Sequence, residues 1–150
     1  MCIRDRFRAG FDWCVASVHD HFDLDRARQT ARIVKAMQDP AVRLIGHPSA
    51  RLIGGRPPID LDLEVIFRAA EETDTALEIN GGLPRLDLPV ESLRRARGRA
   101  LTFVLTSDAH HAKELARLEY AAKNAERAGL DRARVANTWP PEQLAAWAAR

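Results

Sequence analysis

The chain has 150 residues, of which 46% are hydrophobic, and this suits one globular domain with a substantial core. Its 23 basic and 21 acidic side chains nearly cancel, so composition neither indicates nor excludes nucleic acid as a partner. No apolar run approaches the ~20 residues of a membrane span, and no signal-peptide pattern opens the chain. Cys2 and Cys14, the two cysteines, make no disulfide framework. We therefore expect a cytoplasmic protein with no membrane partner.

The first predicted elements follow a leader of six residues. MCIRDR shows no periodicity that continues into the chain and resembles a translated adaptor sequence, so we assign residues 1–6 to a non-native leader and 7–150 to the domain. Residues 11–18 (FDWCVASV) predict a strand, and residues 25–38 predict a helix capped by Asp23 or Asp25. Residues 42–45 (VRLI) predict the second strand.

The second half repeats this order. After a Gly- and Pro-rich loop come a helix at 61–73, a strand at 75–79 (TALEI) and a helix near 90–97. A strand at 101–105 (LTFVL) precedes a helix at 112–128 that stops at Gly129, the residue type favoured after a helix C-terminus. A short apolar piece at 134–136 and a helix after Pro141 close the chain. We interpret three carboxylates as helix caps and three tryptophans as packing residues: Asp60, Asp62, Asp87, Trp13, Trp139 and Trp147.

Alternating strands and helices of these lengths predict an α/β fold with a parallel sheet and right-handed crossovers, either an open sheet or a barrel. Four or five such units amount to half of a (β/α) barrel, which takes about 250 residues. Half a barrel leaves strand edges and apolar helix faces exposed, so we expect the isolated chain to aggregate or to need a partner.

Polar residues gather where each predicted strand ends, which is where parallel α/β folds bind ligands. All five histidines lie in such positions, and none lies on a predicted helix face. In chain order the set is His19, His21, His47, Glu78, Asn80, Asp108, His110 and His111.

Two pairs within this set share one geometry. His19 and His21, like Asp108 and His110, are two positions apart, so on extended backbone both members of a pair face the same side. Imidazole and carboxylate together suit Zn, Mn or Fe better than Mg or Ca. Such a cluster supports hydrolysis, in which metal ions acidify a bound water.

Five segments, in this order and spacing, resemble the C-terminal half of the PHP (polymerase and histidinol phosphatase) domain: SVHDHF, GHPSARLIGGRPPIDLD, LEINGGLPRLDLP, SDAHH and VANTWP. They are most similar to the version at the end of bacterial family X DNA polymerases. GHP with ARL, and EIN with RLDL, are specific to that branch, whereas HxH and DAH fit many metallohydrolases.

The resemblance implies a distorted (β/α)7 barrel with up to three metal ions, Mn²⁺ and/or Zn²⁺, at the strand ends. It implies a metal-dependent phosphoesterase that acts as a 3'-5' exonuclease and processes DNA 3' ends in DNA repair. By motif the metal ligands are His19, His47, Asp108 and His110, with Asp108 and His110 also catalytic. His21 falls where the family varies, so we expect it beside the metals or facing substrate.

Other residues are expected to support this site. Arg51, Arg56 and Arg85 follow the GHP and EIN motifs, where each could hold a phosphate. Asn80 could orient a ligand or the phosphate. Glu78 could be a ligand by residue type, but the resemblance implies that it is structural at the strand end or lies beside the ligands. The implied partners are DNA, as 3' ends that are gapped or single-stranded, and polymerase domains upstream in the same chain.

The chain also departs from the complete family pattern. The motifs that open a PHP domain, HxH first, are absent before Phe11, so the chain supplies four of about nine ligands and we expect this fragment to be inactive alone. Gly81 and Gly82 replace bulkier residues and Ser107 replaces Thr, but none of these changes removes a ligand.

Two alternatives stay open beside the exonuclease. A stand-alone phosphatase of the histidinol-phosphatase type is disfavoured by RLDL and VANTW, and an upstream polymerase palm would exclude it. A non-catalytic scaffold is disfavoured because unpaired buried polar ligands cost free energy without a function.

Overall fold

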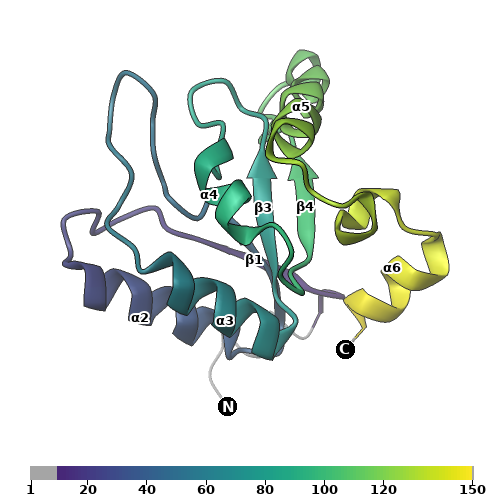
Figure 1. Ribbon diagram of the computed structural model, residues 1–150, viewed down its shortest axis with the longest axis horizontal. Coiled ribbons are helices and arrows are strands. Elements are labelled where there is room, and N and C mark those ends of the chain that lie inside the picture. Colours follow the sequence, from purple (N-terminus) through teal and green to yellow (C-terminus); the bar gives the residue numbers. More distant parts are fainter. Residues whose placement is uncertain (1–9, 150) are drawn as a thin grey trace.

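The computed structural model describes residues 10–149, so the predicted leader at 1–6, including Cys2, lies outside the described part. Four parallel strands form one sheet in the order β1-β2-β3-β4 (Figure 1). Their bounds are β1 Cys14–Ser17, β2 Val42–Gly46, β3 Ala76–Asn80 and β4 Phe103–Thr106. The predicted parallel α/β architecture is therefore confirmed, with each strand within a few residues of its predicted position. The described strands form an open sheet and not a closed barrel.

Five α-helices are described: α2 Arg26–Met37, α3 Leu63–Thr73, α4 Val90–Ala96, α5 Leu118–Ala128 and α6 Pro141–Ala148. Asp25 caps α2 by accepting from the Arg28 amide at 2.8 Å, and Asp62 caps α3. The other two predicted caps are wrong. Asp60 instead pairs with Arg26 at 2.8 Å, and Asp87 is buried ahead of a helix whose N-cap is Pro89.

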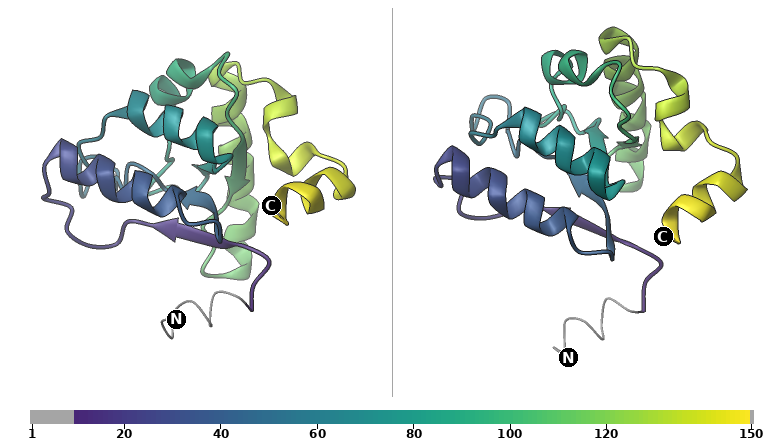
Figure 2. Two further views of the ribbon diagram at one scale, coloured as in Figure 1. Left: turned by 90° about the horizontal axis from the view of Figure 1, so that it is seen from below. Right: turned by 60° about the horizontal axis from the view of Figure 1, so that its bottom comes forward.

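Helices cover the two faces of the sheet unequally. The main core joins α2, α3, α4 and α5 to one face, through residues such as Ile45, Leu77 and Phe103. On the opposite face Trp147 of α6 packs against Leu44 and Ala76. Figure 2 shows α6 (yellow) apart from α2 and α3, which lie side by side, with β1 (purple) at the sheet edge. We call the face under α6 the inner face, because the outer helices lie on the other.

The predicted helix at 112–128 is only partly α-helical. Ala112–Arg117 is a 3-10 helix, and α5 begins at Leu118 and ends at Gly129, which has the left-handed φ of 70°. Gly81 lies directly under this change, because a Cβ there would overlap the Arg117 carbonyl oxygen. No helix among residues 10–149 is long and apolar enough to cross a membrane.

Candidate metal site

His19 and His47 come together at the carboxyl end of the sheet. His47 directly follows β2, and His19 lies two residues beyond β1, so parallel pairing of these strands brings both to one edge. Their rings stack with centroids 5.0 Å apart and an interplanar angle of 29°. His47 is buried and His19 is exposed, so the stacked pair has one ring in the interior and one at the surface.

Glu78 holds the backbone of His47 in place. Its Oε2 accepts hydrogen bonds from the His47 amide and from Asn80 Nδ2, the latter at 3.1 Å. Its Oε1 accepts from the Thr106 hydroxyl at 2.7 Å. Burial raises the pKa of Glu78, and these hydrogen bonds oppose the rise. Glu78 therefore supports the His47 backbone from beneath the histidines.

The His47 side chain is a neutral, buried imidazole. Burial, and after it the charge of Arg85, lower its pKa to about 4, while Asp108 acts in the opposite direction. Its Nδ1 is buried and has no hydrogen-bond partner among the described residues. A neutral imidazole with an unsatisfied ring nitrogen has the chemistry of a metal ligand.

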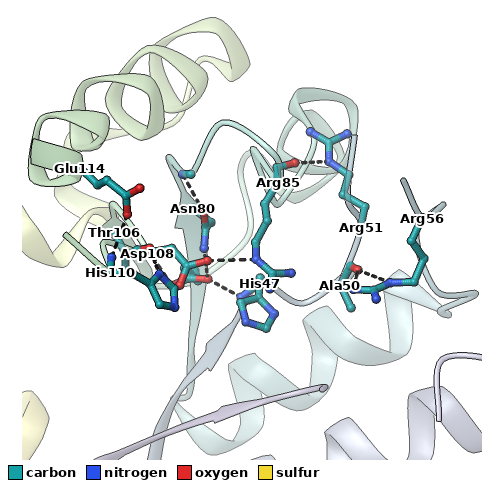
Figure 3. Close-up of polar contacts among 12 residues, drawn as sticks. His47, Ala50, Arg51, Arg56, Asn80, Arg85, Thr106, Asp108, His110 and Glu114 are labelled. Carbon is teal, nitrogen blue, oxygen red and sulfur yellow. Dashed lines mark hydrogen bonds and ion pairs between the residues drawn. The ribbon is translucent and has the colours of Figure 1, made fainter. Parts of the chain in front are cut away.

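Asp108 and His110 form the second part of the site, after β4. Asp108 has the left-handed φ of 50°, and its carboxylate pairs with Arg85 Nε at 3.0 Å (Figure 3). The His110 ring is exposed, with Nδ1 2.9 Å from the Asp108 carbonyl oxygen. The His110 amide donates to Glu114 Oε2 at 2.9 Å. The turn is therefore held by its own polar groups and by Arg85.

The four predicted ligands lie at one end of the sheet but are arranged as two pairs. Within residues 10–149 no three His, Cys, Asp or Glu side chains are close enough together to hold a metal ion. In this arrangement Asp108 is paired with Arg85, and the His110 ring contacts the carbonyl oxygen of its own turn. The donor types and the unpartnered nitrogen of His47 fit a divalent metal such as Mn²⁺ or Zn²⁺.

The arginines predicted to reach phosphate have specific contacts. Arg51 Nε donates to the Arg85 carbonyl at 2.6 Å, and its Nη2 donates to the Leu86 carbonyl. Arg56 donates twice to the Ala50 carbonyl, at 3.0 and 2.7 Å, and stacks over the Phe22 ring. Both therefore fasten loops beside the site, and Arg85 is the one that contacts a predicted ligand.

The remaining predicted residues lie around the pairs. His21 is exposed, with a left-handed φ of 47°, and its carbonyl accepts from Gln29 Nε2 at 2.8 Å. Asn80 is fully buried, and its side chain hydrogen-bonds to Glu78 and to the Gly82 amide.

Sequence reasoning missed two polar supports, Thr106 and Asp87. Thr106 is the last residue of β4, and its hydroxyl donates to Glu78. Because side chains alternate between the two faces of a strand, it lies on the inner face, as Glu78 does. Asp87 Oδ1 accepts from the Ser49 amide at 3.2 Å and so joins the loops after β2 and β3. The sequence did contain a sign that Asp87 is not a helix cap. Pro89 lies between Asp87 and α4, whereas a capping Asp directly precedes the helix that it caps.

Comparison with known proteins gives relatives of two kinds, while no protein-family model matches the chain. Over 111 residues it is 35% identical to the DNA polymerase/3'-5' exonuclease PolX of Bacillus subtilis (strain 168), covering 74% of this chain and 20% of that protein. It is 30% identical to a probable phosphatase of Thermoanaerobacter sp. (strain X514), covering 85% of this chain and 53% of that protein. A probable phosphatase of Vibrio vulnificus (strain YJ016) is 28% identical over 142 residues, or 55% of its length.

These matches confirm the resemblance that the motifs carry. The chain is similar to part of a PHP domain, the class to which the strand-end histidines and the parallel sheet point. Within that class it resembles the domain of a bacterial family X DNA polymerase. The chain spans about half the length of the phosphatases it matches and a fifth of the polymerase.

Proposed function

We propose that this chain is part of a metal-dependent phosphoesterase that removes nucleotides from DNA 3' ends. The observation that carries the proposal is the buried, neutral and unpartnered imidazole of His47, stacked on His19 at the carboxyl end of the sheet. A polar group of this kind costs free energy unless something binds it. Similarity to a polymerase with 3'-5' exonuclease in its name supports the substrate class.

In the proposed site His19, His47, Asp108 and His110 hold Mn²⁺ or Zn²⁺ when the metal is bound. The metal supplies an acidified water and neutralises charge on the phosphate. Glu78 keeps the His47 backbone fixed through its amide, and Asn80 and Thr106 hold Glu78. The role of the protein is thus to fix His47 in the interior, while Asp108 is half-buried and His19 and His110 are exposed.

The test uses the protein in its full length, with Mn²⁺-dependent release of nucleotides from a labelled DNA 3' end as the readout. Asp108→Ala and His110→Ala are each expected to lower the rate at least about a hundredfold, because each removes a ligand. Asp60→Ala is the matched control, since that carboxylate is exposed and pairs with Arg26. Full activity in both ligand variants, or no activity in the wild type with metal supplied, would favour a scaffold.

A second candidate is a phosphatase that acts on a small phosphomonoester. The specific observation in its favour is that the matches to the probable phosphatases extend over more of this chain, 85% and 89%, than the match to the polymerase, 74%. Histidinol phosphate in place of DNA, assayed with the same variants, separates the two. Faster turnover of that compound than of DNA would select the phosphatase.

A further inference from the structure

Arg85 places a positive charge where the proposed site needs a metal. Its Nε lies 3.0 Å from Asp108 Oδ2, and the two side chains are only 21% and 28% exposed. Its Nη1 is buried and has no hydrogen-bond partner in the described part of the chain. The guanidinium is therefore bonded to Asp108 through Nε, and it keeps a buried donor for another acceptor.

The backbone of Arg85 is held independently of this ion pair. Its amide donates to the Gly82 carbonyl at 2.8 Å, and its carbonyl accepts from Arg51 Nε at 2.6 Å. The side chain can therefore leave Asp108 while the loop keeps its shape.

We propose that Arg85 neutralises the Asp108 carboxylate until a divalent metal displaces it, and that the released guanidinium then binds the phosphate of the substrate. This inference rests on the proposed function, since it concerns the same site. A metal ion at Asp108 would meet the positive charge of Arg85 at close range, and the two cations compete for one carboxylate. A phosphate beside the metal offers the planar, two-donor contact that suits arginine.

The alternative is that Arg85 only orients Asp108 for the metal, and it predicts the opposite result. Removing a group that orients a ligand lowers metal affinity, typically by about 10- to 100-fold. Removing a competing cation raises metal affinity. The sign of the change therefore separates the two roles.

The experiment titrates Mn²⁺ into the metal-free, full-length protein and follows free Mn²⁺ by electron paramagnetic resonance. Arg85→Gln is expected to bind Mn²⁺ about fivefold more tightly than the wild type, the scale of a partly exposed ion pair. Arg95→Gln is the matched control, because it removes an exposed pair with Glu64 at 3.0 Å and should leave Mn²⁺ affinity unchanged.

A second titration adds inorganic phosphate to the Mn²⁺-loaded proteins. Arg85→Gln is expected to bind phosphate about tenfold more weakly, because a charge-assisted contact is lost. Arg85→Lys keeps a cation without the planar fork, so its Mn²⁺ affinity should stay near that of the wild type while its phosphate affinity falls. If Arg85→Gln does not fold, the phosphate affinity of Arg85→Lys still tests the inference.

Weaker Mn²⁺ binding by Arg85→Gln, or phosphate affinity that is unchanged in both variants, overturns the inference and leaves the proposed function standing. No Mn²⁺ binding by the wild type overturns both.

Discussion

At the scale of single residues, Asp87 is the carboxylate whose surroundings most oppose its charge. It is fully buried, and among residues 10–149 Oδ1 accepts from the Ser49 amide at 3.2 Å while Oδ2 has no hydrogen-bond partner. Burial raises the pKa of Asp87 from 3.8 to about 6. The folded chain therefore holds this proton at a pH where the unfolded chain has lost it.

The consequence is a pH dependence of stability with a fixed sign. The contribution of Asp87 to the free energy of unfolding is fully present below about pH 4 and is lost as the pH rises through about 6. Asp87→Asn stays neutral, so its stability relative to the wild type should grow by about 3 kcal/mol between pH 4 and pH 7. Urea unfolding of both proteins across this range measures the difference. Asp60→Asn, at an exposed ion pair, should change stability by less than about 1 kcal/mol at every pH; a pH-independent gain in Asp87→Asn would contradict the expectation.

At the scale of elements, Gly81 and Trp147 mark the places where the C-terminal helical segments pack on the sheet. Gly81 lets the Arg117 end of the 3-10 helix lie directly on the turn after β3. Trp147 fastens α6 to the inner face, with Trp13 and Trp139 at ring centroid distances of 6.0 and 6.1 Å. Arg43 connects the same helix to the sheet by donating to the Trp147 carbonyl at 2.8 Å.

Gly81→Ala is expected to destabilise the fold by about 1 to 3 kcal/mol, because backbone and not a flexible side chain fills the space. The free energy of unfolding in urea measures the effect. Gly55→Ala is the control, since its added methyl would meet Leu52 Cβ at an ordinary 3.5 Å. Equal stability of the two variants would mean that the 3-10 helix shifts away from the added methyl group without a cost in stability.

Trp147→Ala is expected to cost about 3 to 5 kcal/mol, the range for a buried aromatic side chain. Loss of this ring also removes the surface over which the Arg43 guanidinium lies, 4.9 Å from the ring centroid. Leu144→Ala on the same helix, 39% exposed, should cost much less. Thermal unfolding of the three proteins ranks them, and similar losses for both variants would mean that α6 contributes only its helical propensity.

The elements were predictable to within a few residues, because hydrophobic periodicity and capping residues are local signals. Asp25, Asp62 and Gly129 each end or begin a helix as predicted. The 3-10 segment and the burial of Asp87 were not predictable, because both depend on loops distant in sequence coming into contact. For the site, the sequence predicts which strand ends meet but not that Arg85 and Asp108 form a pair.

At the scale of the whole molecule, the free edge of β1 is a site at which the chain can associate with another chain. Within residues 10–149 β1 pairs only with β2, and Val15 is 51% exposed. An unpaired strand edge with an apolar side chain is a template for association with another chain.

We expect this 150-residue chain to self-associate as its concentration rises, and Val15→Lys to weaken the association, because a charged residue on an edge strand opposes pairing. Sedimentation velocity over a range of concentrations measures it. Ala31→Lys adds the same charge at an exposed position of α2 and is the control. An equal effect of the two lysines would assign the association to net charge and not to the edge.

The strand order has a consequence for how the chain folds. Every strand pairs with the next strand in sequence, so strand pairing closes only short loops and each βα unit can add to the one before it as the chain is synthesised. The contacts of Trp147 are exceptions, because it bonds to Arg43 104 positions away and also meets the Trp13 ring. We therefore expect α6 to dock last. Trp147→Ala should then speed unfolding and leave the folding rate almost unchanged, which stopped-flow kinetics can measure.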